Sequence, residues 1–155
     1  MACDGAITSG GALVSNSMKK IYKVGTNSII GFAGLVVDCM LFIENKDVDY
    51  KKSFTTLQDY AETVNVVRLD RDGCIYTLES SESADEEGKC QYVWLEVGNC
   101  NKGDFYSIGS GSSFALGALA QGADAAEAVK VASKFDLGTS GELYTCSFNK
   151  KKSKR

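Results

Sequence analysis

Apolar and polar positions alternate with a period of two along much of this chain, which is typical of β-strands. Strand-like runs cover two short stretches around Gly10-Gly11 within 2–15, then 19–25, 28–34, the two arms of 65–80, 91–98, 104–109 and 141–148. The run 28–34, SIIGFAG, is apolar throughout and predicts a strand that is buried on both faces. Asp72-Gly73 is the strongest hairpin signal in the chain.

Helical patterns occupy the stretches between these runs. Segment 35–45 is apolar on nearly every face and predicts a buried helix, whereas 53–64 has apolar residues at helical spacing after a possible N-cap, Ser53. Segment 110–136 is rich in small residues and predicts two helices with a break at Gly122. Asp124 and Glu127 are spaced as a capping box at the start of the second.

The order of elements is therefore strands, two helices, strands, two helices and a strand, with an exposed acidic loop expected over 80–89. Strands in blocks argue against a doubly wound parallel sheet and favour an α+β fold with helices covering mainly antiparallel sheets. The chain of 155 residues fits one domain, predicted to span 1–148.

Composition excludes several kinds of active site. The chain contains no His, which rules out Ser-His-Asp and Cys-His catalysis within it and any His-bearing metal site. Its six Cys include no C-x-x-C pair, so a thiolate zinc site is not expected, and buried Cys in a reducing compartment is the simpler interpretation. No cofactor is indicated. A hydrolase of this composition needs a carboxylate, a Lys or a free N-terminal amine as its base.

The charge is unevenly distributed. The last six residues, KKKSKR, hold five of the 17 basic residues, and the remaining chain has a clear excess of acid. Segment 149–155 is predicted to be a disordered, solvated tail, with contact to nucleic acid or an acidic partner as the alternative. Aromatic residues do not interleave with these lysines, so nucleic acid is not the favoured partner. No apolar run approaches a membrane span and no secretory signal is evident, so a cytoplasmic location is expected.

Several motifs, taken in order, carry a family resemblance. They are ACDGAITSG, KKIYKVG, IIGFAG, YSIGSGSSFALGAL, GADAAEAVKVASKFD and SGELYT. Together they resemble the proteasome β-subunit and HslV-type proteases, which are N-terminal-nucleophile hydrolases. The resemblance runs from residue 2 to about 148 and is weakest over 46–104. It implies an αββα sandwich, in which two antiparallel sheets lie between helix pairs, and a threonine protease activity.

The resemblance also implies roles for individual residues. Asp4 and Lys20 match the family's aspartate and lysine, and an ammonium group beside a hydroxyl and an amine favours their deprotonated, attacking forms. An ordinary ion pair between strands is the alternative. The backbone N–H of Gly34, in GFAG, matches a donor that stabilises an oxyanion, although a tight turn explains this glycine equally well.

Three further residues match the same site late in the chain. Ser110 corresponds to the residue that supports the reactive amine, and Asp136 and Thr139 correspond to the acid and hydroxyl of that network. A turn at the end of a helix is the alternative for the last two. GSGSS has no Lys and is not a P-loop.

The family's nucleophile is a terminal Thr on a strand that pairs with the strand of Asp4, and this chain begins just before Asp4. Thr8 cannot replace the terminal Thr, because it lies after Asp4 and is not terminal. Removal of Met1 would expose Ala2, which has no nucleophilic group. A sheet that lacks an inner strand keeps unpaired backbone groups and uncovered apolar surface. We therefore favour a misassigned start, or a strand supplied by another chain.

Two alternatives to a peptidase stay open. In the first, the chain is a non-catalytic structural or regulatory ring subunit. In the second, it is a small binding module that acts through its basic tail. By resemblance, the expected partners are peptides or unfolded proteins as substrates, further copies in a homo-oligomeric ring, and an ATP-driven unfoldase.

Overall fold

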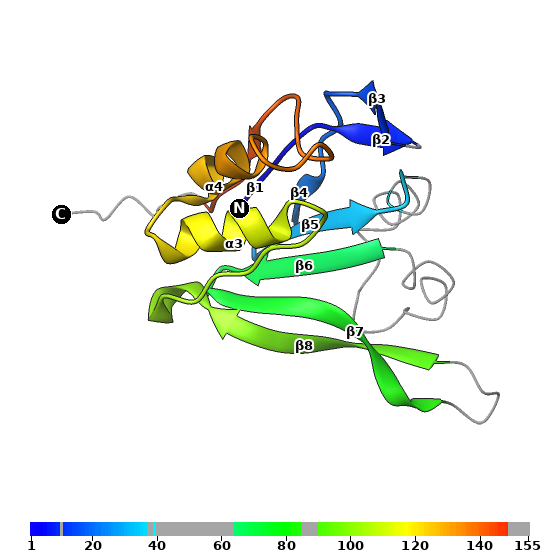
Figure 1. Cartoon of the computed structure of the whole chain (residues 1–155). Coiled ribbons are helices and arrows are strands. Elements are labelled where there is room, and N and C mark those ends of the chain that lie inside the picture. The colour runs from blue at the N-terminus through cyan, green and yellow to red at the C-terminus, as the bar shows by residue number, and fades with distance from the viewer. Residues whose placement is uncertain (10, 37–38, 40–63, 85–89, 149–155) are drawn as a thin grey trace.

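The computed structural model of this chain describes residues 1–9, 11–36, 39, 64–84 and 90–148 (Figure 1). The strands are β1 (Ala2–Cys3), β2 (Ile7–Ser9), β3 (Ala12–Ser15), β4 (Ile21–Val24), β5 (Ser28–Gly34), β6 (Val64–Asp70), β7 (Cys74–Ala84), β8 (Cys90–Asn99) and β9 (Tyr144–Thr145). The helices are the 3-10 turn η2 (Cys100–Lys102), α3 (Ser112–Ala120) and α4 (Ala125–Ala132). In the described part of the chain, no helix is long and apolar enough to cross a membrane.

The main sheet has five antiparallel strands in the order β4-β5-β6-β7-β8. Its β6–β7 hairpin turns at the predicted Asp72-Gly73, where Gly73 has a φ of 93° and its N–H donates to the Asp70 carbonyl at 2.9 Å. Neighbouring strands in the sheet follow one another along the sequence, so short turns are sufficient to connect β4 with β5 and β6 with β7.

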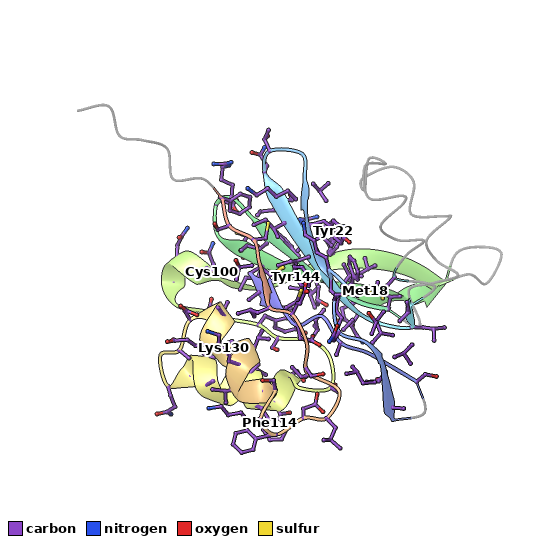
Figure 2. All side chains as sticks on the ribbon, turned by 90° about the horizontal axis from the view of Figure 1, so that it is seen from above. Met18, Tyr22, Cys100, Phe114, Lys130 and Tyr144 are labelled. Atoms are coloured by element: carbon purple, nitrogen blue, oxygen red, sulfur yellow. The ribbon has the colours of Figure 1, made fainter. Side chains whose placement is uncertain are left out.

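Strand β5 lies inside the fold, as its continuous apolar sequence predicts. Ile29 is 0% exposed, and Ile30, Gly31 and Phe32 are buried as well. One side of the sheet holds a cluster of Ile30, Phe32, Cys39, Val64 and Val66, against which Met18 and Tyr22 pack. Figure 2 shows Met18 and Tyr22 near one another on this side of the molecule.

The predicted helices of 110–136 are confirmed as α3 and α4. The Asp124 carboxylate accepts hydrogen bonds from the backbone N–H groups of Ala126 and Glu127, and the Glu127 side chain accepts from the N–H of Asp124. Gly122, with a φ of 91°, separates the helices. They pack on each other through Ala115, Ala128 and Ala132, whose small side chains allow close approach.

The N-terminal strands form two small sheets beside these helices. β1 pairs with β9, which brings Cys3 opposite Tyr144, and β2 pairs with β3 around the predicted turn. Helix α4 contacts β1, so this strand lies between the helix pair and the main sheet (Figure 1). The layered arrangement confirms the predicted α+β sandwich.

Three local predictions need correction. Segment 104–109 forms no strand, because it has no strand to pair with among the described residues. The expected loop 80–89 is a strand as far as Ala84, because pairing with β8 outweighs its polar composition. The strand expected over 141–148 is confined to Tyr144–Thr145.

The second predicted helix pair falls largely outside the described residues. At its start, the Cys39 N–H donates to the Leu35 carbonyl at 2.9 Å, which is the spacing of an α-helix. The remainder of 35–45, the helix 53–64 and the tail 149–155 stay predictions.

Candidate active site

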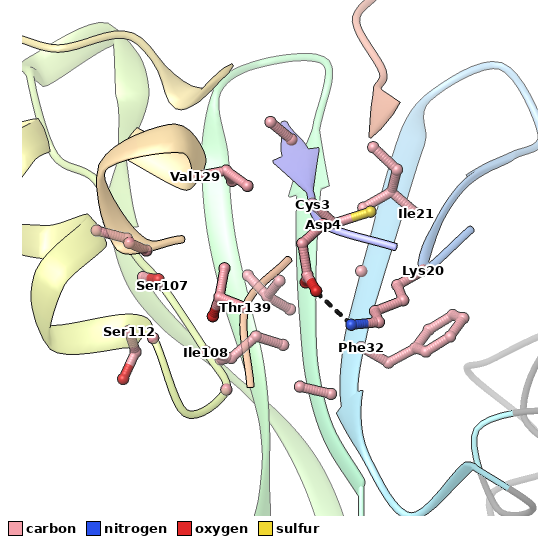
Figure 3. Close-up of a pocket in the computed structure, with 18 of the residues that line it drawn as sticks. Cys3, Asp4, Lys20, Ile21, Phe32, Ser107, Ile108, Ser112, Val129 and Thr139 are labelled. Carbon is pink, nitrogen blue, oxygen red and sulfur yellow. Dashed lines mark hydrogen bonds and ion pairs between the residues drawn. The ribbon is translucent and has the colours of Figure 1, made fainter. Parts of the chain in front are cut away.

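Asp4 and Lys20 form an ion pair between the end of β1 and the start of β4. Lys20 Nζ lies 2.9 Å from Asp4 Oδ1, and both side chains are largely buried, at 19% and 16% exposed. The second carboxylate oxygen, Oδ2, accepts from the backbone N–H of Ala6 at 2.9 Å and of Ser140 at 3.3 Å. Asp4 is therefore held from three directions, and it fixes the ammonium group of Lys20 at the position that Figure 3 shows.

A second polar network lies where the segment after α4 meets the start of α3. Asp136 Oδ2 accepts the hydroxyl hydrogen bonds of Ser110 at 2.7 Å and of Thr139 at 2.5 Å. These two bonds, the one from Thr139 above all, lower the pKa of the Asp136 carboxyl, because they stabilise its ionised form. Ser140, the residue after Thr139, donates its N–H to Asp4 and so links the two networks through the backbone.

A cavity of about 810 Å³ brings these groups together between the helix pair and the main sheet. Asp4, Lys20, Gly34, Ser110 and Thr139 line it. Asp136 is not among the lining residues and reaches the cavity through the hydroxyl groups of Ser110 and Thr139. The floor of the cavity is apolar and includes Ile21, Val67 and Leu69. All six residues selected from the sequence therefore belong to one region.

The direction of the Gly34 N–H follows from the strand pairing. The Phe32 N–H donates to the Lys20 carbonyl at 3.1 Å, so the backbone groups of Phe32 point toward β4. Because these directions alternate along a strand, the N–H of Gly34 points the same way, past the start of β4. Its φ of 141° is a backbone conformation that favours glycine. This end of β5 can therefore offer a backbone donor to a molecule in the cavity.

The thiol of Cys3 also lines the cavity, and no pattern in the sequence indicates it. Burial raises the pKa of this thiol, although a hydrogen bond from the backbone of Lys20 acts in the opposite direction. A Cys beside Asp4 in sequence gives no sign of such a position, because only the pairing of β1 with β9 decides which way its side chain points. Among the described residues no three Cys, Asp or Glu gather as metal ligands do.

Comparisons with known proteins agree on one family. A family model described as Proteasome subunit matches residues 1–61, the part that contains Asp4, Lys20 and Gly34. Two relatives are called ATP-dependent protease subunit HslV. The one from Thermosipho africanus (strain TCF52B) is 28% identical and the match covers 90% of this chain and 85% of the relative. The one from Thermosipho melanesiensis is also 28% identical, over 76% and 68% of the two chains.

A solved structure has the same fold. The crystal structure of eukaryotic HslV from Trypanosoma brucei matches with a TM-score of 0.60 and 20% identity, over 92% of this chain and 88% of that one.

Proposed function

We propose that this chain, which belongs to the proteasome and HslV family, is a threonine-type peptidase subunit whose cavity activates and orients a chain-terminal hydroxyl. One observation carries the proposal: a largely buried Lys20, fixed at 2.9 Å by Asp4, lies in the same cavity as a hydroxyl-carboxylate network. A hydrolase without His needs another group to activate its nucleophile, and a fixed ammonium group is one that can do so.

Lys20 acts on the nucleophile through its charge. A positive charge within a few ångströms lowers the pKa of a hydroxyl group and increases the fraction that can attack a peptide carbonyl. Asp4 keeps the ammonium group in place. Because one of the three N–H donors of Lys20 is used by Asp4, two remain for groups in the cavity.

The remaining residues orient the amine and stabilise the developing oxyanion. Ser110 supports the α-amine that serves as the general base, and Asp136 with Thr139 orients Ser110. The N–H of Gly34 donates to the oxyanion of the tetrahedral intermediate. Loss of one such donor reduces kcat about 10²-fold to 10³-fold in other hydrolases.

The residues ahead of Asp4 are Met1, Ala2 and Cys3, and none offers a hydroxyl group. The proposal therefore assigns to this chain the groups that activate a nucleophile, and the nucleophile itself is to be identified by experiment.

A second candidate is a non-catalytic subunit of the same fold. In that case the nitrogen of Met1, which donates to the Cys146 carbonyl at 2.9 Å, serves only to extend the β1–β9 pairing. The Met1 side chain lies on Gly31, where an added Cβ would be 2.9 Å from its sulfur. The remaining hypothesis, a binding module that uses the tail 149–155, stays a prediction, because the tail lies outside the described residues.

In either case we place the protein in the cytoplasm, as a homo-oligomeric ring that receives peptides or unfolded proteins from an ATP-driven unfoldase. The name of the relatives, ATP-dependent protease subunit HslV, supports the parts of this proposal that concern a subunit assembly and a dependence on ATP. Native mass spectrometry of the purified protein measures the number of copies directly.

The test of the peptidase proposal starts from the protein as its own host produces it. Mass spectrometry identifies the N-terminal residue, and fluorogenic peptides measure hydrolysis. We expect a terminal Thr, activity in wild type and Lys19→Ala, and at least a hundredfold loss in Lys20→Ala, in line with other pre-organised catalytic groups. Lys19 is the matched control, because it is adjacent and exposed. A protein that begins at Met1 or Ala2 and cleaves no peptide supports the non-catalytic subunit.

A further inference from the structure

Two glycines lie where the segment that enters α3 meets the segment that follows α4. Gly111 is the N-cap of α3 and comes directly after Ser110, and Gly138 comes directly before Thr139. Neither glycine is required by its backbone, because Gly111 has a φ of −80° and Gly138 has no positive φ either. Residues with a side chain adopt a negative φ readily. The reason for a glycine at these two positions therefore lies in the space around them.

That space is filled by the hydroxyl groups that are bonded to Asp136. A Cβ built at Gly111 falls on Thr139 Oγ1 and lies 3.3 Å from Asp136 Oδ2. A Cβ built at Gly138 lies 2.6 Å from Ser110 Oγ and again 3.3 Å from Asp136 Oδ2. Non-bonded carbon atoms pack at about 3.5–4.0 Å, so a contact as short as 2.6 Å forces a neighbour to move. Each glycine leaves room for a hydroxyl group that the other segment supplies.

We propose that Gly111 and Gly138 are positioning residues, whose lack of a side chain lets the two segments approach until both hydroxyl groups reach one oxygen of Asp136. The relation is reciprocal, because Gly111 makes room for Thr139 and Gly138 makes room for Ser110. Both hydrogen bonds end on Asp136 Oδ2, at 2.7 Å from Ser110 and 2.5 Å from Thr139. Two donors that share one acceptor atom have little freedom to shift.

An added methyl group acts on the hydroxyl groups before it acts on the fold. The backbone at this place is fixed, because the Thr139 N–H donates to the Asp136 carbonyl and the Ala115 N–H donates to the Gly111 carbonyl, both at 3.1 Å. A hydroxyl group, in contrast, moves by rotation about a single side-chain bond. The smallest relief of either clash is a rotation that carries the hydroxyl away from Asp136 and breaks its hydrogen bond.

The two positions differ in how easily this relief is reached. Ser110 is exposed and can turn into the solvent, whereas Thr139 is buried. The Cβ at Gly111 also lies 3.2 Å from the Cβ of Ala132 in α4, so it is confined on a second side. Gly138→Ala therefore disturbs mainly the Ser110 bond, and Gly111→Ala disturbs the Thr139 bond and the packing of α4 as well.

The catalytic meaning of this arrangement rests on the proposed function, in which Ser110 supports the reactive amine and Asp136 with Thr139 orients it. Both glycines also line the cavity, so a simpler role has to be separated from the proposed one. In that simpler role the glycines only keep the cavity open for a substrate. A methyl group would then leave the hydrogen bonds to Asp136 intact.

The first test is a pair of double-mutant cycles, measured by urea denaturation of the full chain. We expect Gly138→Ala to destabilise wild type more than it destabilises Ser110→Ala, and Gly111→Ala to destabilise wild type more than Thr139→Ala. The expected coupling is about tenfold in the equilibrium constant of unfolding, within the range for residues in contact. Gly117→Ala is the control, because a Cβ there meets no atom within 4 Å and Ala favours a helix.

Additive effects in both cycles overturn the proposal, because the methyl groups would then not meet the hydroxyl groups. If Gly111→Ala does not fold, the double variant with Thr139→Ala is decisive. A folded double variant supports the steric relation, and one that stays unfolded while Thr139→Ala alone folds contradicts it.

The second test follows the carboxyl group of Asp136 by NMR against pH. The hydroxyl bonds lower the pKa of Asp136, so we expect Gly138→Ala and Gly111→Ala to raise it toward its ordinary value of 3.8. Gly117→Ala should leave this pKa unchanged. A loss of stability without a change in the pKa of Asp136 would mean that the glycines serve the backbone alone, which contradicts the proposal.

Peptide hydrolysis separates this inference from the proposed function. In the protein as its host produces it, Gly138→Ala should lower kcat and leave KM unchanged, since Ser110 acts in the reaction and not in substrate binding. A raised KM with an unchanged kcat means that the glycines only keep the cavity open, and it overturns the inference. If wild type cleaves no peptide and the couplings are found, the proposed function fails and the positioning role stands.

Discussion

Lys20 Nζ lies 2.9 Å from Asp4 Oδ1, although sixteen residues separate the two along the chain. The β2–β3 hairpin occupies that interval and returns the chain, so that β4 starts beside the end of β1. Asp4 has a wider structural role than its partner, because its other oxygen holds the backbone at Ala6 and Ser140. This asymmetry gives the first prediction.

Asp4→Ala should destabilise the protein more than Lys20→Ala. Removing Asp4 leaves two backbone N–H groups and an ammonium group without their acceptor, for which we expect a loss of about 3 kcal/mol in the free energy of unfolding. Removing Lys20 leaves a carboxylate that still accepts two hydrogen bonds, and we expect about 1 kcal/mol. Urea denaturation measures both. Lys19→Ala, which removes only an exposed cation over the Tyr22 ring, should cost about 0.5 kcal/mol. Equal losses for Asp4→Ala and Lys20→Ala would refute the role of Asp4 at the backbone.

Thr139→Val should raise the pKa of Asp136 more than Ser110→Ala does. Both hydroxyl groups stabilise the carboxylate, and the bond from Thr139 has the larger effect. Carboxyl chemical shifts followed by NMR against pH measure the two pKa values, with Ser113→Ala on exposed α3 as the control. The order of the two shifts is the critical result, because the reverse order would contradict the geometry of the network.

The same network makes stability depend on pH in the acid range. The pKa of Asp136 is lower in the folded chain than its ordinary value of 3.8. The contribution of Asp136 to the free energy of unfolding is therefore complete above pH 3.8, and it is lost as the pH falls through the lower pKa of the folded state. Denaturation at a series of pH values should show a smaller acid loss for Asp136→Asn than for wild type. Parallel pH profiles for the two proteins would mean that the hydroxyl bonds do not stabilise the ionised form.

Gly141→Ala should be far more damaging than Gly103→Ala. Both glycines have positive φ, 80° and 92°, so both substitutions incur a backbone cost of about 1–2 kcal/mol. A Cβ at Gly141 would also fall on the Asn16 backbone, whereas a Cβ at Gly103 meets nothing within 4 Å. The difference in unfolding free energy between the two variants measures the cost of disturbing the packing around Gly141, next to Ser140, which donates its N–H to Asp4. Similar losses for both variants would indicate that this segment packs loosely.

Asp124→Ala should destabilise α4 by about 1 kcal/mol through the loss of its N-cap. Glu127→Gln is the matched control, because an amide oxygen can still accept from the Asp124 N–H, and we expect little change. Thermal unfolding followed by circular dichroism compares the two. If Glu127→Gln lowers the stability as much as Asp124→Ala does, the charge at the start of the helix, and not the hydrogen-bonded cap, stabilises α4.

Local patterns determined much of the fold. The apolar run of β5, the Asp72-Gly73 turn and the capping box at Asp124 each depend on neighbouring residues, and each is confirmed. Segments whose state depends on a distant partner were predicted less well. β7 continues through polar residues to Ala84 because β8 offers it a ladder, and 104–109 has an apolar pattern but no strand to pair with in the described structure.

By itself, the sequence determined which chemistry is excluded and which residues are candidates: a chain without His, with Asp4, Lys20 and a late Ser, Asp and Thr in a recognisable order. Only the tertiary structure decided that these residues surround one cavity, that Ser140 joins the two networks, that the Cys3 thiol lines the cavity and that α3 keeps an uncharged face outside. The reason is physical. Backbone propensity and periodicity act over a few residues, whereas a site is made by strand pairing and packing between segments more than a hundred residues apart.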